Sequence, residues 1–169
     1  MILLNPGPVN VSERVRKALN RPDLCHREPE CVELLQGIRQ KLLKAFVPGS
    51  ESEYTAVLLT GSGTAAVEAA ALSSIPTGKR MLVLNNGVYG ERISSMIGVH
   101  RLAVPELKMD WTKRPDPEQL RLALRQRPEV HVVAMVHHET TTGLLNPVAE
   151  VGAIEIGRAS CRERVLPTV

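Results

Sequence analysis

The chain has 169 residues, of which 43% are hydrophobic and 23% are charged, and its formal net charge is +3. This length suits one ordinary domain with a core of its own, and the composition excludes disordered, collagen-like and low-complexity chains. Because aromatic residues make up only 2% of the chain and the net charge is small, neither a base-stacking platform nor a broad basic surface for nucleic acid is expected.

The sequence also bears on membranes and redox state. No apolar run approaches the roughly 20 residues that a membrane-spanning helix needs, and no secretory signal is expected at the start. Cys25, Cys31 and Cys161 are odd in number and form no C-x-x-C pair, so neither a disulfide framework nor a zinc ribbon is expected. The sequence therefore predicts a cytoplasmic protein with reduced thiols and no membrane partner.

The first sixty residues predict two helices and a strand. A short helix is expected from Ser12 to Leu19, with Ser12 as its cap. From Pro29 to Phe46 apolar residues recur at three- and four-residue steps, which predicts a longer helix. Residues 54–60 form a continuous apolar run, which is typical of a buried strand.

Helices and strands are then expected to alternate. The expected helices are 64–74, 91–97, 117–125 and one beginning near Pro147, and the expected strands are 81–84, 101–104 and 130–136. This alternation predicts an α/β fold with a mostly parallel sheet covered by helices on both faces. Ligands bind at the carboxyl ends of the strands in such sheets, so we expect the chemistry in the turns after Thr60, Leu84 and Val136.

The last residues break this pattern. From Ile156 onward there are several arginines, no periodic apolar face and no strand signal, and EIGRASCRERV at 155–165 resembles a translated sequencing adapter. We therefore expect a truncated chain, in which residues 1–154 are native and 155–169 are a non-native tail. The alternative is an unusual basic tail that belongs to the protein.

The turn from Thr60 to Thr64 predicts an anion site. It would present free backbone N–H groups and the positive end of a helix dipole, and its glycines let the backbone approach a ligand closely. The hydroxyls of Ser62 and Thr64 add possible donors. The turn lacks both the lysine of a P-loop and the third glycine of a dinucleotide fingerprint, so a phosphate group is favoured over a nucleotide. The alternative is a plain connection between strand and helix.

The other two turns carry an aromatic ring and a run of hydroxyls. Tyr89 follows the strand that ends at Leu84, and its ring could cover a planar ligand or pack against the rim of the sheet. The hydroxyls of residues 140–142 follow the strand that ends at Val136 and could orient a ring oxygen. A metal site at His137, His138 and Glu139 is not expected, because adjacent side chains on an extended chain point to opposite faces.

Five motifs together carry a family resemblance. They are LLNPGP at 3–8, DLCHREPE at 23–30, GSGTAAVEAA at 61–70, NNGVYG at 85–90 and MVHHETTTGLLNPVAEVGAI at 135–154. In this order the motifs resemble the class V, fold-type I aminotransferases that depend on pyridoxal 5'-phosphate, over essentially all of residues 1–154. Within that family the sequence is most similar to the 2-aminoethylphosphonate:pyruvate branch, and more distantly to alanine:glyoxylate and serine:pyruvate aminotransferases.

The resemblance implies a role for particular residues. The residues that it implies hold the cofactor phosphate are Ser62, Gly63 and Thr64. Tyr89 would stack on the pyridine ring, and Thr140 would hydrogen-bond the ring hydroxyl. Those implied to lie near the substrate mouth are Gly7, His26 and Arg27. The family fold would be the N-terminal part of a large cofactor-binding domain, preceded by an N-terminal segment.

The family reaction moves an amino group from a small-molecule donor to a 2-oxo acid, and a lysine forms the Schiff base with the cofactor. For the branch named above, the donor is 2-aminoethylphosphonate and the acceptor is pyruvate, which gives phosphonoacetaldehyde and alanine. No lysine of this sequence lies in a matching motif, so we expect the catalytic lysine beyond the truncation. The resemblance therefore implies a homodimeric parent enzyme in phosphonate catabolism and a fragment that is inactive alone.

Three alternatives stay open from the sequence. The chain could come from an alanine or serine aminotransferase, could be a self-contained phosphate- or nucleotide-binding α/β module, or could be a truncated partner that only dimerises with a full-length enzyme. If the chain is a truncated aminotransferase, the family fold implies that strands from beyond residue 155 lie between the present ones. The fragment would then expose unpaired strand edges and tend to aggregate.

Overall fold

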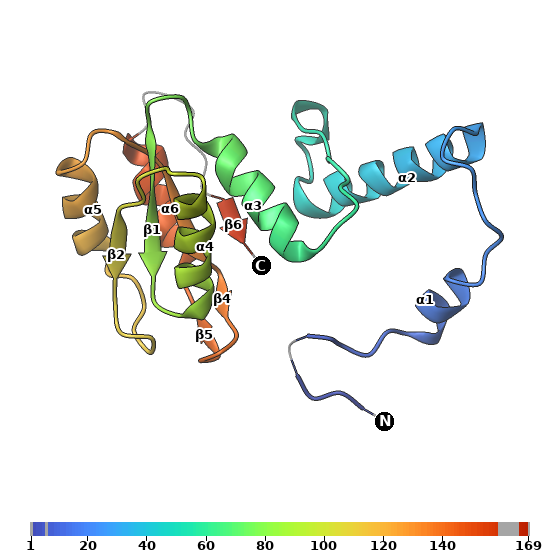
Figure 1. Cartoon of the computed structure of the whole chain (residues 1–169), viewed down its shortest axis with the longest axis horizontal. Coiled ribbons are helices and arrows are strands. Elements are labelled where there is room, and N and C mark those ends of the chain that lie inside the picture. Colours follow the sequence, from blue (N-terminus) through green and yellow to red (C-terminus); the bar gives the residue numbers. More distant parts are fainter. Residues whose placement is uncertain (1, 6, 159–165, 169) are drawn as a thin grey trace. The chain divides into compact units, whose positions relative to one another are not determined.

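The computed structural model describes residues 2–5, 7–158 and 166–168, with side-chain surroundings for all of these except 155–158 and 166–168. The chain divides into two units, residues 1–60 and 61–169. Figure 1 shows the helices and strands of both units. Most of the adapter-like stretch, residues 159–165, lies outside the described residues. None of the described helices combines the length and the apolarity that crossing a bilayer requires.

The first unit contains two α-helices and a short 3-10 helix. α1 (Glu13–Ala18) begins after Ser12, whose side chain accepts a hydrogen bond from the backbone N–H of Val15 at 3.4 Å. α2 (Pro29–Phe46) has the predicted bounds and starts with proline, which suits the first helical position. η1 (Glu51–Glu53) follows it. None of these helices contains a buried residue, so the apolar stripe of α2 stays partly exposed within this unit.

The prediction of a buried strand at residues 54–60 is wrong for this structure. The segment forms no strand, and the side chains of Val57 and Leu59 are 75% and 60% exposed. A strand needs a neighbouring strand to take its backbone hydrogen bonds, and the sheets in the described residues include none that pairs with this segment. Residues 54–60 have the composition of a strand, but the described residues supply no partner strand for them.

The second unit alternates helices and strands as predicted. Its helices are α3 (Gly63–Ser74), α4 (Val88–Val99), α5 (Pro117–Arg125) and α6 (Val148–Arg158). Its strands are β1 (Arg80–Asn85), β2 (Glu106–Lys108), β3 (Val130–Val136), β4 (His138–Glu139), β5 (Leu144–Leu145) and β6 (Leu166–Thr168). β3 and α5 have the predicted bounds, whereas α4 begins at Val88 rather than at Glu91.

Four of these strands form one parallel sheet in the order β2, β1, β3, β6, and β4 pairs with β5 in a separate antiparallel ladder. In this register Leu82 lies opposite Val133, and Val83 lies opposite Glu106. The prediction of a mostly parallel sheet is confirmed. The expectation that missing strands separate the present ones is wrong for β1, β2 and β3, which pair directly.

The sheet has a hydrophobic core on each face. One core joins β1 and β3 to α5 and α6 through Leu82, Leu84, Leu120, Leu124, Val133, Met135, Val151 and Ile154. The other joins the same strands to α3 and α4 through Ala71, Met81, Val83, Ile93, Ile97, Val132, Ala134 and Val136. Successive strand side chains point to opposite faces, so both faces of β1 are buried. Burying each large aliphatic side chain contributes roughly 1.5–3 kcal/mol.

The strand predicted at residues 101–104 is displaced toward the C-terminus. Arg101 has a φ of 59°, a left-handed conformation that follows the end of α4 and does not fit a strand. The ladder with β1 begins at Pro105, whose carbonyl accepts a hydrogen bond from the Val83 N–H at 3.0 Å. The apolar run at 102–104 therefore leads into β2 rather than forming it.

Candidate functional site

The predicted ligand-binding edge of the sheet lies in the second unit. β1 and β3 end there, and α4 begins there beside β4 and β5 (Figure 1). α3 reaches β1 through the short connection at residues 75–79, so it runs back along the sheet and its N-terminus lies toward the same edge (Figure 1). The three turns that the sequence singled out therefore lie toward the same end of the sheet.

Ser62 is the N-cap of α3. Its side chain accepts a hydrogen bond from the backbone N–H of Ala65 at 3.2 Å, and its carbonyl accepts one from Ala66 at 3.2 Å. In the described part of the chain, the backbone N–H groups of Gly63 and Thr64 donate no hydrogen bond. Nothing lies within 4 Å of the position that a Cβ would take on Gly63. The start of α3 thus offers two backbone donors, a glycine with open space and an exposed hydroxyl at Thr64.

Tyr89 lies in the first turn of α4, not in a loop before it. Its side chain is 37% exposed, and the guanidinium of Arg92 lies 5.2 Å from the centre of its ring. Its backbone N–H donates to Oε2 of Glu139 at 3.1 Å. The ring is therefore held by α4 at the carboxyl end of β1, with one face near a cation.

The side chain of Glu139 caps the N-terminus of α4. This side chain is fully buried, and its Oε1 accepts hydrogen bonds from the backbone N–H of Thr141, at 3.3 Å, and from the Thr141 hydroxyl. Gly87, the N-cap of α4, provides no side-chain cap of its own, so the Glu139 carboxylate from β4 caps the helix instead. Sequence reasoning considered Glu139 only as a possible metal ligand and missed its capping role.

Thr140 opens the tight turn that links β4 to β5. It is half-buried, and the turn closes with hydrogen bonds from the N–H groups of Thr142 and Gly143 to the carbonyl of Glu139, at 3.2 and 2.8 Å. Gly143 has a φ of 74°, a conformation that favours glycine. The three threonines are thus held in one short turn beside the start of α4.

Two buried asparagines join the ends of β1 and β3. Asn86 donates to Asn146 Oδ1 at 2.8 Å and to the carbonyl of Lys113 at 2.9 Å. Asn146 donates to Asn86 Oδ1 at 3.2 Å and to the carbonyl of Val136 at 2.7 Å. Sequence reasoning missed this pair, because residues 86 and 146 are neighbours only after the strands are placed side by side.

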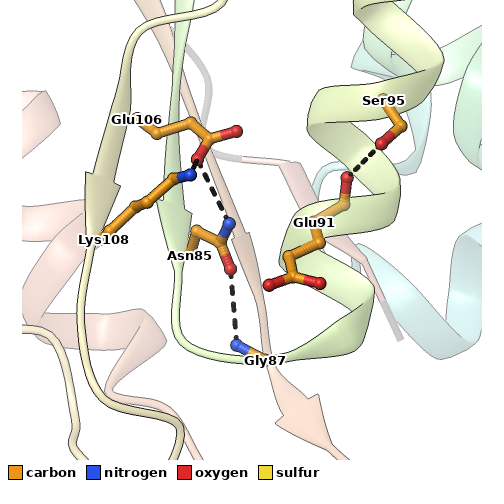
Figure 2. A network of polar contacts seen from close by, with 6 residues as sticks. All are labelled: Asn85, Gly87, Glu91, Ser95, Glu106 and Lys108. Carbon is orange, nitrogen blue, oxygen red and sulfur yellow. Dashed lines mark hydrogen bonds and ion pairs between the residues drawn. The ribbon is translucent and has the colours of Figure 1, made fainter.

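A second polar network lies where β1 meets β2. Figure 2 shows the Asn85 amide between the Glu106 carboxylate, at 3.3 Å, and the backbone N–H of Gly87, at 3.4 Å. The Lys108 ammonium lies 3.2 Å from the same carboxylate. Burial raises the pKa of Glu106, but the neighbouring polar side chains of Ser94, Lys108 and Asn85 outweigh it and bring the pKa below its ordinary value.

The residues predicted near the substrate lie in the first unit. Gly7, His26 and Arg27 are exposed, and Nε of Arg27 donates to Nε2 of His26 at 3.3 Å. The position of these three residues at the substrate mouth stays a prediction.

No cluster of metal-ligating side chains is found among the described residues. In β4, His138 is exposed whereas the adjacent Glu139 is fully buried. The side chains of these two neighbours thus face opposite ways. The Glu139 carboxylate accepts hydrogen bonds from the N–H groups of Tyr89 and Thr141.

Residues 12–157 match the family described as Aminotransferase class-V. The chain belongs to this family. The prediction of the family is confirmed, and with it the dependence of the family on pyridoxal phosphate. The match spans both units of the chain and includes the turns at the start of α3, at the start of α4 and after β3.

Two curated relatives give the branch of the family to which the chain is similar. A 2-aminoethylphosphonate–pyruvate transaminase of Syntrophobacter fumaroxidans is 40% identical over 151 residues, which cover 89% of this chain and 40% of that protein. A transaminase of the same description from Lysinibacillus sphaericus is 36% identical over 152 residues, with 90% and 41% covered. The chain therefore spans about 40% of the length of the curated relatives it matches.

Solved structures of the family have the same fold. Pyridoxamine-pyruvate aminotransferase from Mesorhizobium loti matches with a TM-score of 0.82 and 30% identity, over 93% of this chain and 39% of that one. Alanine–glyoxylate aminotransferase from Nostoc sp. matches with a TM-score of 0.79 and 29% identity, over 90% and 40%. The chain thus has the fold of part of a fold-type I aminotransferase.

Proposed function

We propose that this chain is the N-terminal part of a pyridoxal-phosphate enzyme that moves an amino group from 2-aminoethylphosphonate to pyruvate. The observation that carries the proposal is the carboxyl end of the sheet, where Glu139 joins Tyr89, at the start of α4, to the threonine turn after β4. The start of α3 lies toward the same end (Figure 1). Residues 1–154 would be native and 155–169 a non-native tail, although β6 of that tail pairs with β3. The genomic sequence after Ile154 tests this boundary.

The start of α3 fits a phosphate group. Of the two helices that begin at this edge, α4 already receives the carboxylate of Glu139, whereas α3 is capped only by the hydroxyl of Ser62. The positive end of α3 and the N–H groups of Gly63 and Thr64 therefore stay available to an anion. Ser62, Gly63 and Thr64 would hold the phosphate of the cofactor.

The remaining contacts suit a planar aromatic ring. Tyr89 would stack on the pyridine ring, and Thr140 would hydrogen-bond the ring hydroxyl. When bound, pyridoxal phosphate supplies the electron sink on which amino transfer depends. The described residues bind and orient it, while the lysine and the pyridine-nitrogen partner would come from the rest of the parent protein.

The choice of amino donor rests on the relatives. Transaminases that are 36–40% identical carry the name of 2-aminoethylphosphonate, which supports that donor. The structural similarity to an alanine–glyoxylate enzyme at 29% identity favours the second candidate, an aminotransferase for small amino acids. Amino-donor screening of the full-length parent separates the two, since only the first consumes 2-aminoethylphosphonate and forms alanine from pyruvate.

A cofactor titration tests the proposed site. The full-length parent should bind pyridoxal phosphate with a change in its visible absorbance, and the double substitution Ser62→Ala, Thr64→Ala should raise the Kd by about tenfold to a hundredfold, because hydrogen bonds to a charged group are lost. Ser73→Ala, in the last turn of the same helix, is the control and should leave the Kd unchanged. An absorbance spectrum that the cofactor does not alter would overturn the proposal.

A further inference from the structure

Among the buried side chains of the described residues, Glu139 is the only charged one. No lysine, arginine or histidine in the described chain forms an ion pair with it. A buried carboxylate without a cation is costly unless hydrogen bonds compensate it. In this structure hydrogen bonds from Tyr89 and Thr141 compensate it.

The hydrogen bonds of Glu139 join two segments that are far apart in the sequence. One carboxylate oxygen accepts from the N–H of Tyr89, at the start of α4, and the other accepts from the N–H and hydroxyl of Thr141. Its backbone carbonyl closes the turn to Gly143. One residue therefore ties the tyrosine of α4 to the threonine turn.

Gly87 leaves the space that this arrangement needs. A Cβ on Gly87 would lie 2.5 Å from the Cδ, the Cγ and the Oε2 of Glu139, so any side chain at 87 would push the carboxylate away from α4. The φ of Gly87 is 171°, an extended value that any residue adopts. Close approach, rather than backbone conformation, is therefore the reason for glycine at this position.

We propose that Glu139 is a positioning residue for the cofactor site, whose buried carboxylate sets the Tyr89 ring and the hydroxyl of Thr140 relative to each other. This inference rests on the proposed function, because the proposed cofactor is the one planar ligand that both Tyr89 and Thr140 would contact. Glu139 itself touches neither cofactor nor substrate. It acts through the backbone of Tyr89 and of the turn at residues 140–143.

Glu139→Gln in the full-length parent tests the inference. The amide keeps the size of the side chain, but its NH₂ group must face an N–H donor, at either Tyr89 or Thr141, so one of the two anchors is lost. In the cofactor-free protein, we expect amide hydrogen exchange at Tyr89 and Thr141 to accelerate by about tenfold. With pyridoxal phosphate, we expect the Kd to rise by about tenfold and the circular dichroism of the bound cofactor to change.

Gly87→Ala should reproduce both effects, and the double variant should be no worse than the stronger single one, because both changes break the same contact. Gly98→Ala is the matched control on α4, since nothing lies within 4 Å of a Cβ there. The amides of Met81 to Leu84 in β1 should keep their exchange rates in every variant, which separates a local effect from unfolding.

Two results would overturn the inference. One is unchanged exchange at Tyr89 and Thr141 in Glu139→Gln. The other is faster exchange with an unchanged Kd and an unchanged circular dichroism signal, because Glu139 would then stabilise the fold without positioning the cofactor. If the wild-type parent itself does not bind pyridoxal phosphate, the proposed function fails together with the cofactor role of Glu139.

Discussion

At the scale of single residues, buried polar side chains hold the carboxyl edge of the sheet together. Asn86, Asn146 and Glu139 come from different turns, and each is almost fully buried and hydrogen-bonded to another segment. Leaving one such group without its partner costs about 1–3 kcal/mol. The positions of Tyr89 and of the threonine turn therefore depend on side chains that would contact no ligand.

Glu106 makes the stability of this edge depend on pH. The pKa of Glu106 is lowered in the folded protein from the ordinary value of 4.5, so its stabilising contribution is present above that value and is lost as the pH falls through the folded pKa. Glu106→Gln should therefore lower the urea midpoint of the full-length parent at neutral pH, with a difference that disappears in acid. Glu118→Gln, in an exposed ion pair on α5, is the control and should show no such pH dependence. A pH-independent effect of Glu106→Gln would contradict this assignment.

At the scale of elements, helix starts are the best-specified features of the chain. α2 and α5 both begin with proline and have the bounds that the sequence predicts. α4 begins earlier than predicted, because its N-terminus is capped from β4 by Glu139 rather than by a residue of its own turn. A cap supplied from elsewhere in the chain leaves no local signal in the sequence.

The cap of α5 gives a prediction at this scale. Asp116 accepts a hydrogen bond from the N–H of Glu118 at 2.9 Å, and α5 covers one hydrophobic core through Leu120 and Leu124. Asp116→Ala should destabilise the full-length parent by about 1 kcal/mol, measured by urea denaturation. Asp110→Ala removes only an exposed ion pair with Lys113 and should change the stability by less than about 0.5 kcal/mol. Equal effects of the two changes would contradict a capping role for Asp116.

At the scale of the whole molecule, two observations concern what lies outside the described sheet. It spans about 40% of the length of its relatives, and residues 54–60 have the composition of a buried strand but expose Val57 and Leu59. An exposed apolar segment that lacks a partner strand favours association between copies. We infer that this segment pairs with a strand from the rest of the parent protein.

Substitution of Val57 and Leu59 tests this inference. Val57→Lys with Leu59→Lys should reduce aggregation of the isolated chain, measured by light scattering, and should destabilise the full-length parent by several kcal/mol, because the lysines would then be buried in a sheet. Leu122→Lys, at a comparably exposed position on α5, should leave the parent within about 0.5 kcal/mol. A parent that tolerates the double change unaltered would show that residues 54–60 stay exposed.

The sequence by itself determined the family, the alternation of helices and strands, and the three turns at the carboxyl edge. Apolar periodicity, prolines at helix starts and glycine-rich turns are local signals that a chain carries without its fold. Only the tertiary structure decided that residues 54–60 do not form a strand, that β2 lies at 106–108, and that Glu139 caps α4. Each of these depends on whether a segment distant in the sequence supplies a hydrogen-bond partner, and no local pattern records that.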